Sequence, residues 1–232
     1  MDIKSIYYDS EYSEEYLLHK NRYLNPDRFQ EQKIKNIKSL ISNSDLSILL
    51  DIGCGIGTIA LTEYTDEKTV VGQDYALSGL KIGYSIAKNE KKEIFWIKGS
   101  INYMPYNDAT FTTIIAADLF EHLDDKDSAL LLSELKRILK REGTLAIYSP
   151  SKEHFLEKLK KMHILKLDES HIGMRSVKQI QKIAENAGFI TIKSYYAVSH
   201  IPILKQFEII FGRIPFIKGL FKRRICWLGS PK

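Results

Sequence analysis

Three glycines and one aspartate follow an apolar run in the stretch LLDIGCGIGTIA, residues 49–60. The glycines are Gly53, Gly55 and Gly57, and Asp51 stands two residues before the first of them. Glycine tolerates positive φ and lets a ligand approach the backbone, and a helix that follows offers free N–H groups. The stretch therefore predicts a strand, a binding turn and a helix. A carboxylate at Asp51 repels a pyrophosphate and favours a ligand that carries an ammonium or a sulfonium.

The spacing around this turn excludes two phosphate-binding motifs. No Gly-Lys-Ser/Thr sequence follows, as a P-loop requires, and Thr58 stands where the dinucleotide fingerprint has its third glycine. Asp74 ends the next apolar run, TVVGQD, and a carboxylate there can accept two hydrogen bonds from a ribose diol. Open α/β sheets bind ligands at the carboxyl ends of their strands. The pattern therefore predicts a cationic nucleoside as the ligand.

Alternating apolar runs and helical patterns must position these residues. The first 45 or so residues have helical spacing, interrupted at Asn25 and Pro26, and Asp27 is the predicted cap of the following helix. Ser78 is the predicted N-cap of a later helix, and Gly188 the predicted end of another. We predict helices at 58–64, 78–89, 127–139 and 176–187, and strands at 47–52, 69–74, 93–99, 111–118, 144–149, 189–198 and 223–229.

Strands that alternate with helices predict an α/β fold. We expect a Rossmann-like, doubly wound, mostly parallel seven-stranded sheet with an antiparallel edge strand and helices on both faces. We expect one domain over residues 1–232, with an N-terminal helical cap (1–45), a ligand-binding core (46–198) and a helical insertion followed by the last strand (199–232).

The composition indicates a cytoplasmic protein. The chain has 232 residues, of which 44% are hydrophobic, and we find no apolar window long enough to span a membrane. The acidic, aromatic N-terminus does not resemble a signal peptide. The two cysteines, Cys54 and Cys226, predict neither a disulfide framework nor a zinc site, and Cys54 is interpreted as a small filler.

The basic charge is concentrated near the C-terminus. Residues 201–232 contain seven basic residues and one acid, whereas the whole chain carries +5, so a basic surface for nucleic acid is not predicted. Apolar residues recur every three or four positions in 201–224, and Pro202 and Pro215 are positioned to start short helices. This segment is interpreted either as a cover over the sheet and substrate pocket or as a face for peripheral contact with an anionic membrane or a lipid-linked substrate.

Four stretches together resemble the class I S-adenosylmethionine-dependent methyltransferases. They are LLDIGCGIGTIA, VVGQDYA, IKGSINYMPYNDATFTTIIAADLFEHL and LKREGTLAIYSPS. The likeness is greatest to the small-molecule branch called type 11, which includes enzymes of quinone and lipid methylation. It covers about residues 46–189, and the segments before it and after Val198 match poorly.

The resemblance implies a set of residues that bind S-adenosyl-L-methionine. Asp51 and the three glycines of the turn would surround its methionine part, Asp74 would hold the ribose hydroxyls, and Tyr75 beside it is a further contact. Ser100 stands where the family usually has an acid for the adenine amino group, so weaker adenine selection is expected. Ile101 would pack on the adenine face.

The same resemblance places a substrate entrance after the fourth strand. Asp118, with Glu121 and His122, matches a D-x-x-E-H-L stretch at the methionine end of the cofactor. Tyr12, in the aromatic segment YYDSEYSEEY, is expected either to close over the cofactor or to pack against the edge of the sheet.

His122 and His171 are the candidate catalytic residues. A base is needed only if the acceptor is a hydroxyl, a protonated amine or an acidic carbon, and His154 is a further candidate for that task. The histidines and acids lack close ligand spacing in the sequence, so no metal site is expected.

The predicted function is methyl transfer from S-adenosyl-L-methionine to a small-molecule or lipid-like acceptor, leaving S-adenosyl-L-homocysteine. Oxygen is the first expectation for the acceptor atom, with nitrogen and carbon open. An RNA- or protein-directed methyltransferase and a non-catalytic, cofactor-binding partner subunit are the alternatives. The acceptor's identity and the oligomeric state are left open.

Overall fold

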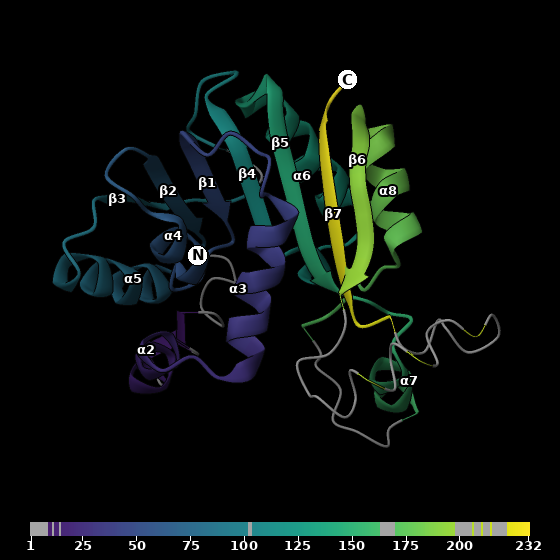
Figure 1. Ribbon diagram of the computed structural model, residues 1–232, viewed down its shortest axis with the longest axis horizontal. Helices are drawn as coiled ribbons and strands as arrows, with labels where there is room; N and C mark the ends of the chain where they lie inside the picture. Colours follow the sequence, from purple (N-terminus) through teal and green to yellow (C-terminus); the bar gives the residue numbers. More distant parts are fainter. Residues whose placement is uncertain are drawn as a thin grey trace.

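A computed structural model describes residues 9–10, 12–13, 15–101, 104–162, 170–197, 206, 210, 214 and 222–232. Its strands form one sheet in the order β3-β2-β1-β4-β5-β7-β6 (Figure 1). The strands are β1 (Ile48–Ile52), β2 (Thr69–Asp74), β3 (Ile94–Lys98), β4 (Phe111–Ala117), β5 (Leu139–Pro150), β6 (Phe189–Ala197) and β7 (Arg224–Pro231). Neighbours from β3 to β5 are parallel, and β7 runs antiparallel to both β5 and β6. The predicted fold class is confirmed, with the antiparallel strand lying one place in from the edge.

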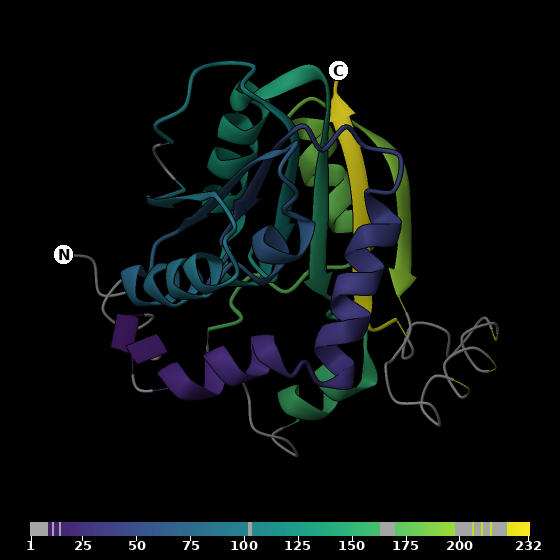
Figure 2. The same ribbon diagram turned by 60° about the vertical axis from the view of Figure 1, so that its left-hand side comes forward.

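Helices cover both faces of the sheet. Those of the described part are α2 (Tyr16–Leu24), α3 (Arg28–Leu40), α4 (Thr58–Glu63), α5 (Leu77–Asn89), the 3-10 helix η1 (Phe120–His122), α6 (Asp125–Ile138), α7 (Phe155–Lys161) and α8 (Val177–Asn186). On one face, α3 contacts β5 and β7, while α4 and α5 contact the strands from β1 to β3. The other face packs on α6 and α8. Figures 1 and 2 show α2 and α7 beyond the carboxyl ends of the parallel strands.

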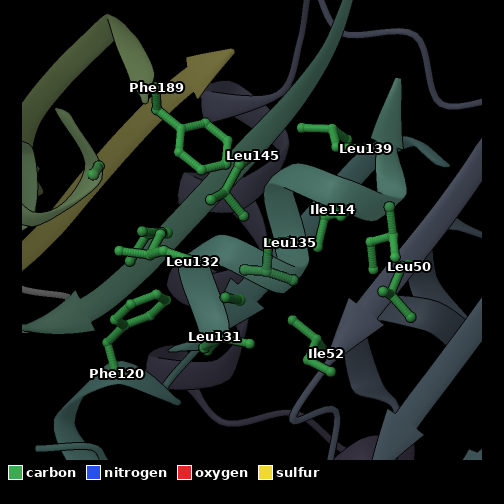
Figure 3. Packing of buried hydrophobic residues seen from close by; sticks show 14 of the residues in the cluster. Leu50, Ile52, Ile114, Phe120, Leu131, Leu132, Leu135, Leu139, Leu145 and Phe189 are labelled. Atoms are coloured by element: carbon green, nitrogen blue, oxygen red, sulfur yellow. The ribbon is translucent and has the colours of Figure 1, made fainter. Parts of the chain in front are cut away.

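Successive strand residues point to opposite faces, so each strand contributes to two cores. Leu50 and Leu145 belong to the core against α6, together with Leu131 and Leu135 of that helix (Figure 3). Their strand neighbours Leu49 and Ala146 belong to the core against α3 and α4. Full burial of a leucine side chain contributes about 1.5–3 kcal/mol, so near-continuous apolar strands stabilise both layers at once.

Local signals in the sequence account for several element boundaries. Asp27 caps α3 as predicted, since its Oδ1 accepts a hydrogen bond from the N–H of Gln30. Ser176 caps α8 in a capping box with Gln179. Gly188 follows that helix with a φ of 84°, which places it in the left-handed region expected of a C-terminal glycine.

Three predicted boundaries are wrong. In each case a hydrogen bond or a strand pairing that the local sequence does not indicate sets the boundary. Ser78 is not the N-cap of α5, which starts at Leu77, because its N–H donates to Asp9 from the N-terminal segment. The helix predicted from 127 starts at Asp125, since Asp124 accepts the N–H of Asp127. The strand predicted from 144 starts at Leu139, which pairs with Phe111 across an irregular register.

The helices predicted to start at Pro202 and Pro215 lie outside the described residues, as does most of the basic segment 201–224. None of the helices in the described ranges is both long and apolar enough to cross a membrane.

The ring of Trp96, on β3, fills the space under the glycine turn and α5. It lies where side chains at Gly57, Gly72 and Gly83 would point. A Cβ at Gly83 would come 2.5 Å from the carbonyl oxygen of Ile56 and 2.6 Å from the Trp96 ring. Because these three residues are glycines without side chains, α5 can lie close to the turn.

We expect Gly83→Ala to destabilise the fold. At an ordinary helix position this change stabilises by up to about 1 kcal/mol. Here a fixed carbonyl and a large ring occupy the new methyl group's place, so we expect a net loss of about 1–2 kcal/mol in the free energy of unfolding. Urea denaturation measures it, with Lys88→Ala, at an exposed position of the same helix, as the control. A gain in stability at Gly83 would contradict the described packing.

Candidate functional site

Two adjoining cavities lie at the carboxyl ends of β1, β2 and β4. The first has a volume of about 220 Å³ and is lined by residues at the ends of β1, β2 and β3 and by residues that follow β4. The second, of about 500 Å³, is lined by residues of α2, α3, the glycine turn and Ser170–His171. Tyr12, Gly53, Asp118 and His122 line both cavities, so the two share one boundary. Residues that lie as far apart in the sequence as Tyr12 and His171 therefore meet at one site.

Hydrogen bonds attach the glycine turn to the end of β2. The N–H groups of Gly53 and Cys54 donate to the carbonyl oxygen of Gln73, at 2.8 and 3.1 Å. The N–H of Gly55 donates to Oδ2 of Asp74, at 2.7 Å. Gly53 and Gly55 have φ values of 66° and 56°, a region that side chains disfavour. The turn thus needs glycine for its own conformation.

The three glycines differ in what they face. Gly53 lines both cavities and Gly55 the second, whereas Gly57 is buried and does not line either cavity in the described part of the chain. The Trp96 ring occupies the position of a Gly57 side chain, and the Tyr12 hydroxyl that of a Gly55 side chain. The structure therefore places Tyr12 over the turn and leaves Gly57 in a packing position.

Asp51 is buried beneath the second cavity, with 2% of its surface exposed. Its Oδ2 accepts the N–H of Ala60 at 3.1 Å, within the first turn of α4. Burial raises its pKa to about 7, although the Ala60 hydrogen bond and the charge of Lys33 favour the ionised form. A carboxylate in this position attracts a cationic ligand.

Asp74 lines the first cavity together with Tyr75. Its two oxygens accept backbone N–H groups, Oδ2 from Gly55 and Oδ1 from Ala76 at 2.8 Å. Burial still raises its pKa above the usual range. An ionised carboxylate has about four acceptor positions, so Asp74 keeps acceptor capacity for ligand hydroxyls.

Ser100 and Ile101 line the first cavity, as does Gly99 before them. The sequence did not single out two other lining residues, Gln73 and Asp127. The amide of Gln73 accepts the Tyr106 hydroxyl at 2.6 Å, and Asp127 comes from the first turn of α6. Asp127 therefore supplies a carboxylate to this cavity, in which Ser100 stands at the position where the resemblance leads one to expect an acid.

Asp118 lies between the two cavities with a positive φ of 55°. Its carboxylate forms ion pairs with Lys33 of α3, at 2.6 Å, and with Arg224 of β7. Burial opposes ionisation, but these two cations outweigh it and hold its pKa well below the usual range. Nothing in the local sequence marks Lys33 or Arg224, because they lie 85 and 106 residues from Asp118.

Glu121, His122 and His171 come together at the boundary of the two cavities. Their ligand-forming atoms all lie within 4.8 Å of one another. Glu121 is 2% exposed and accepts the hydroxyl of Ser149 at 2.9 Å. Burial first, and the nearby charge of Asp118 second, raise its pKa. These three side chains lie close together in space although their spacing along the sequence does not indicate it.

His154 lies away from both cavities, whereas Cys54 lines the second. His154 is 2% exposed and is absent from the described lining of both cavities, and its ring packs against Phe155. Burial raises the pKa of Cys54 well above its usual value, so its thiol stays protonated at neutral pH. A Cβ at Gly72 would lie 3.2 Å from its sulfur, in agreement with a filler role.

Comparison with known proteins identifies the domain. Residues 49–143 match the family model described as a methyltransferase domain. The chain is 33% identical over 107 residues to a sterol 24-C-methyltransferase of Schizosaccharomyces pombe, covering 44% of this chain and 27% of that protein. It is 31% identical over 117 residues to a probable methyltransferase of Aspergillus luteorubrus, covering 46% and 41%. The chain thus matches less than half of the length of these relatives.

A solved structure agrees over nearly the whole chain. The magnesium protoporphyrin IX methyltransferase of Synechocystis PCC 6803, crystallised with bound SAH, superposes with a TM-score of 0.73 and covers 99% of both chains. Its sequence identity is 14%, so the likeness concerns the fold. The family match, the strand order and the glycine turn agree with one another, and residues 49–143 form a methyltransferase domain of the class I S-adenosylmethionine-dependent kind.

Proposed function

We propose that the protein transfers a methyl group from S-adenosyl-L-methionine to an oxygen of a small-molecule or lipid-like acceptor. The observation that carries this proposal is the pair of adjoining cavities, one lined by Asp74 and Ser100 and the other by Asp51, Tyr12 and His171. The nucleoside occupies the first cavity, the methionine part of the cofactor the glycine-turn side of the second, and the acceptor the remaining space of the second. The named relatives that modify a sterol and a magnesium porphyrin support a small-molecule acceptor.

The roles of the cofactor residues follow from their positions. Asp74 accepts hydrogen bonds from the ribose hydroxyls, and Tyr75 and Ile101 line the same cavity beside the adenosine. Asp127 supplies the acid for the adenine amino group that Ser100 does not provide. Asp51 attracts the cationic methionine part from beneath the turn, and Tyr12 covers it.

The transfer is a single displacement. The cofactor supplies a methyl group on a cationic sulfur, and the protein supplies position and electrostatics. The acceptor oxygen forms the new bond to the methyl carbon, and the carbon–sulfur bond breaks with its electron pair moving to sulfur. The hydroxyl proton leaves towards the face formed by His122 and His171. Alignment of oxygen, carbon and sulfur can lower such a barrier by about 7–11 kcal/mol.

We expect Asp74→Asn to weaken the binding of S-adenosyl-L-homocysteine by about tenfold or more, because a hydrogen bond to a charged group contributes about 1.5–3 kcal/mol. The amide keeps one acceptor oxygen for the turn, which limits damage to the fold. Isothermal titration calorimetry measures the affinity. Glu67→Gln, at an exposed acid, is the matched control and should bind normally. Tight binding of NADH by the unaltered protein, without binding of S-adenosyl-L-homocysteine, would reject the proposal.

Binding should also release a proton from Asp51. Its pKa is about 7 without ligand, so about half of the molecules carry the proton at pH 7. The ligand's ammonium group favours the ionised carboxylate and lowers that pKa, so roughly half a proton should leave per ligand bound at pH 7 and almost none at pH 9. Calorimetry in phosphate and in Tris at the same pH measures the release.

Two comparisons isolate the contribution of Asp51 to this release. Asp51→Asn should remove it, because the amide does not titrate. For the unaltered protein, 5′-methylthioadenosine, which lacks the ammonium group, should release less than S-adenosyl-L-homocysteine. Equal release by the variant and the unaltered protein would assign the proton to another group.

The methyl transfer itself is tested with cofactor labelled in its methyl group and pools of hydroxylated, amino and carbon-acidic small molecules. We expect label in an O-methyl product, identified by mass spectrometry. An N- or C-methyl product would overturn the choice of oxygen, and label only in RNA or protein would overturn the acceptor class. Cofactor binding without transfer to any pool would favour the non-catalytic alternative.

A further inference from the structure

The trio of Glu121, His122 and His171 has the composition and position of a metal-binding site. Two imidazoles and one carboxylate have their ligand-forming atoms within 4.8 Å of one another. His122 lines both cavities and His171 lines the second, so a bound ion would face open space on that side. Two of the ligands follow β4 and the third lies about 50 residues later, so the trio forms only in the folded chain.

Backbone contacts fix the two segments that carry the ligands. The N–H of Gly173 donates to the carbonyl oxygen of Glu121 at 2.7 Å. The guanidinium of Arg175 donates to the carbonyl oxygens of Phe120 and Leu123, at 2.8 and 3.0 Å. A Cβ at Gly173 would lie only 1.9 Å from the Leu123 oxygen, so only glycine permits this approach. The ligand backbones are thus placed before any ion binds.

Hydrogen bonds also orient two of the three ligands. Nδ1 of His122 lies 3.1 Å from the carbonyl oxygen of Ser170. A carbonyl only accepts, so Nδ1 carries the proton in this contact and Nε2 of a neutral ring holds the lone pair. The Ser149 hydroxyl donates to Oε2 of Glu121. Metal-bound histidines and carboxylates typically have such partners, a carbonyl on the far ring nitrogen and a donor on the carboxylate.

Glu121 has no salt bridge to any residue within the described ranges. The cations Lys33 and Arg224 pair with Asp118 instead. Buried charges in proteins are paired with other charges or coordinate metals. A cation between Glu121 and the two imidazoles would satisfy this carboxylate.

The ligand types select the class of ion. Mg²⁺ and Ca²⁺ prefer oxygen ligands, whereas imidazole suits divalent transition metals such as Zn²⁺, Mn²⁺ and Co²⁺. Metal–ligand bonds of about 2.0–2.2 Å put neighbouring donors about 3–4 Å apart. Small rotations of the three side chains would therefore bring their ligand-forming atoms from within 4.8 Å of one another to this distance. Three protein ligands leave at least one position free on the cavity side, as in catalytic metal sites.

We propose that Glu121, His122 and His171 bind one divalent transition-metal ion, whose open position takes an oxygen of the acceptor. Ion binding stands on the geometry alone, and the contact with the acceptor rests on the proposed function. The ion holds the acceptor as an oxyanion, whose proton passes to solvent, and the oxyanion then displaces the methyl group from sulfur as described above. The imidazoles act as ligands in that case, and no free histidine base is required.

Cobalt titration of the untagged, chelator-stripped full chain tests ion binding. We expect one Co²⁺ per chain, with visible absorption bands of nitrogen-coordinated cobalt that Zn²⁺ removes by competition. His171→Gln and Glu121→Gln should abolish the bands or weaken cobalt binding at least about tenfold, and Ser149→Ala should weaken it about tenfold by releasing the carboxylate. Glu67→Gln should bind cobalt like the unaltered protein. Near-UV circular dichroism and urea midpoints show which variants remain folded.

Two results would overturn the proposal. Absence of cobalt binding by the unaltered protein, or equal binding by folded His171→Gln, would reject the metal site. Methyl transfer at an unchanged rate after the ion is removed would reject its contact with the acceptor. Cobalt binding without any affinity for S-adenosyl-L-homocysteine would leave the metal site in place and refute the methyltransferase proposal, so the two failures are distinct.

Discussion

The hydrogen bonds between the glycine turn and the end of β2 set the geometry of the whole site. Gly53 and Cys54 donate to the carbonyl of Gln73, and Gly55 donates to the side chain of Asp74. Because β1 and β2 are parallel neighbours, these bonds hold the turn across the ends of both strands. The turn then leads into α4, and the Asp74 carboxylate that accepts its Gly55 N–H lines the first cavity. Charge and backbone are thus positioned by the same contacts.

Besides Asp127, four acids lie around this site, and their surroundings favour different charge states. Asp118 is neutralised by two cations and stays ionised, whereas burial raises the pKa of Asp51, Asp74 and Glu121. Like charges in a water-poor site disfavour one another's ionisation. Burial therefore favours the protonated forms of these three acids, and a cationic ligand shifts them towards the ionised forms. This arrangement suits a positively charged guest and disfavours a phosphate-bearing one, which is the selectivity inferred from Asp51 in the sequence.

Features that depend on neighbours in the chain were predictable. The seven strands, the turn, the position of Asp74 and the cap at Asp27 all follow from residues a few positions apart. The pairing of Asp118 with Lys33 and Arg224 was not, because α3 and β7 reach it only through the topology of the sheet. The ligand trio was missed for the same reason, since spacing along the chain says little about spacing in space. Gly57 follows the motif, but its packing against Trp96 depends on a strand almost 40 residues later.

The place of β7 in the sheet bears on how the chain folds while it is being made. β7 follows β6 in sequence, yet it lies between β5 and β6 and supplies the ladder hydrogen bonds of both. During translation β6 therefore emerges from the ribosome without its partner, and one edge of β5 stays open. The three strands can join only after β7 has emerged, and its Arg224 then reaches Asp118. A nascent chain can thus form the parallel strands β1 to β5 first, and the ion pair between Arg224 and Asp118 forms last.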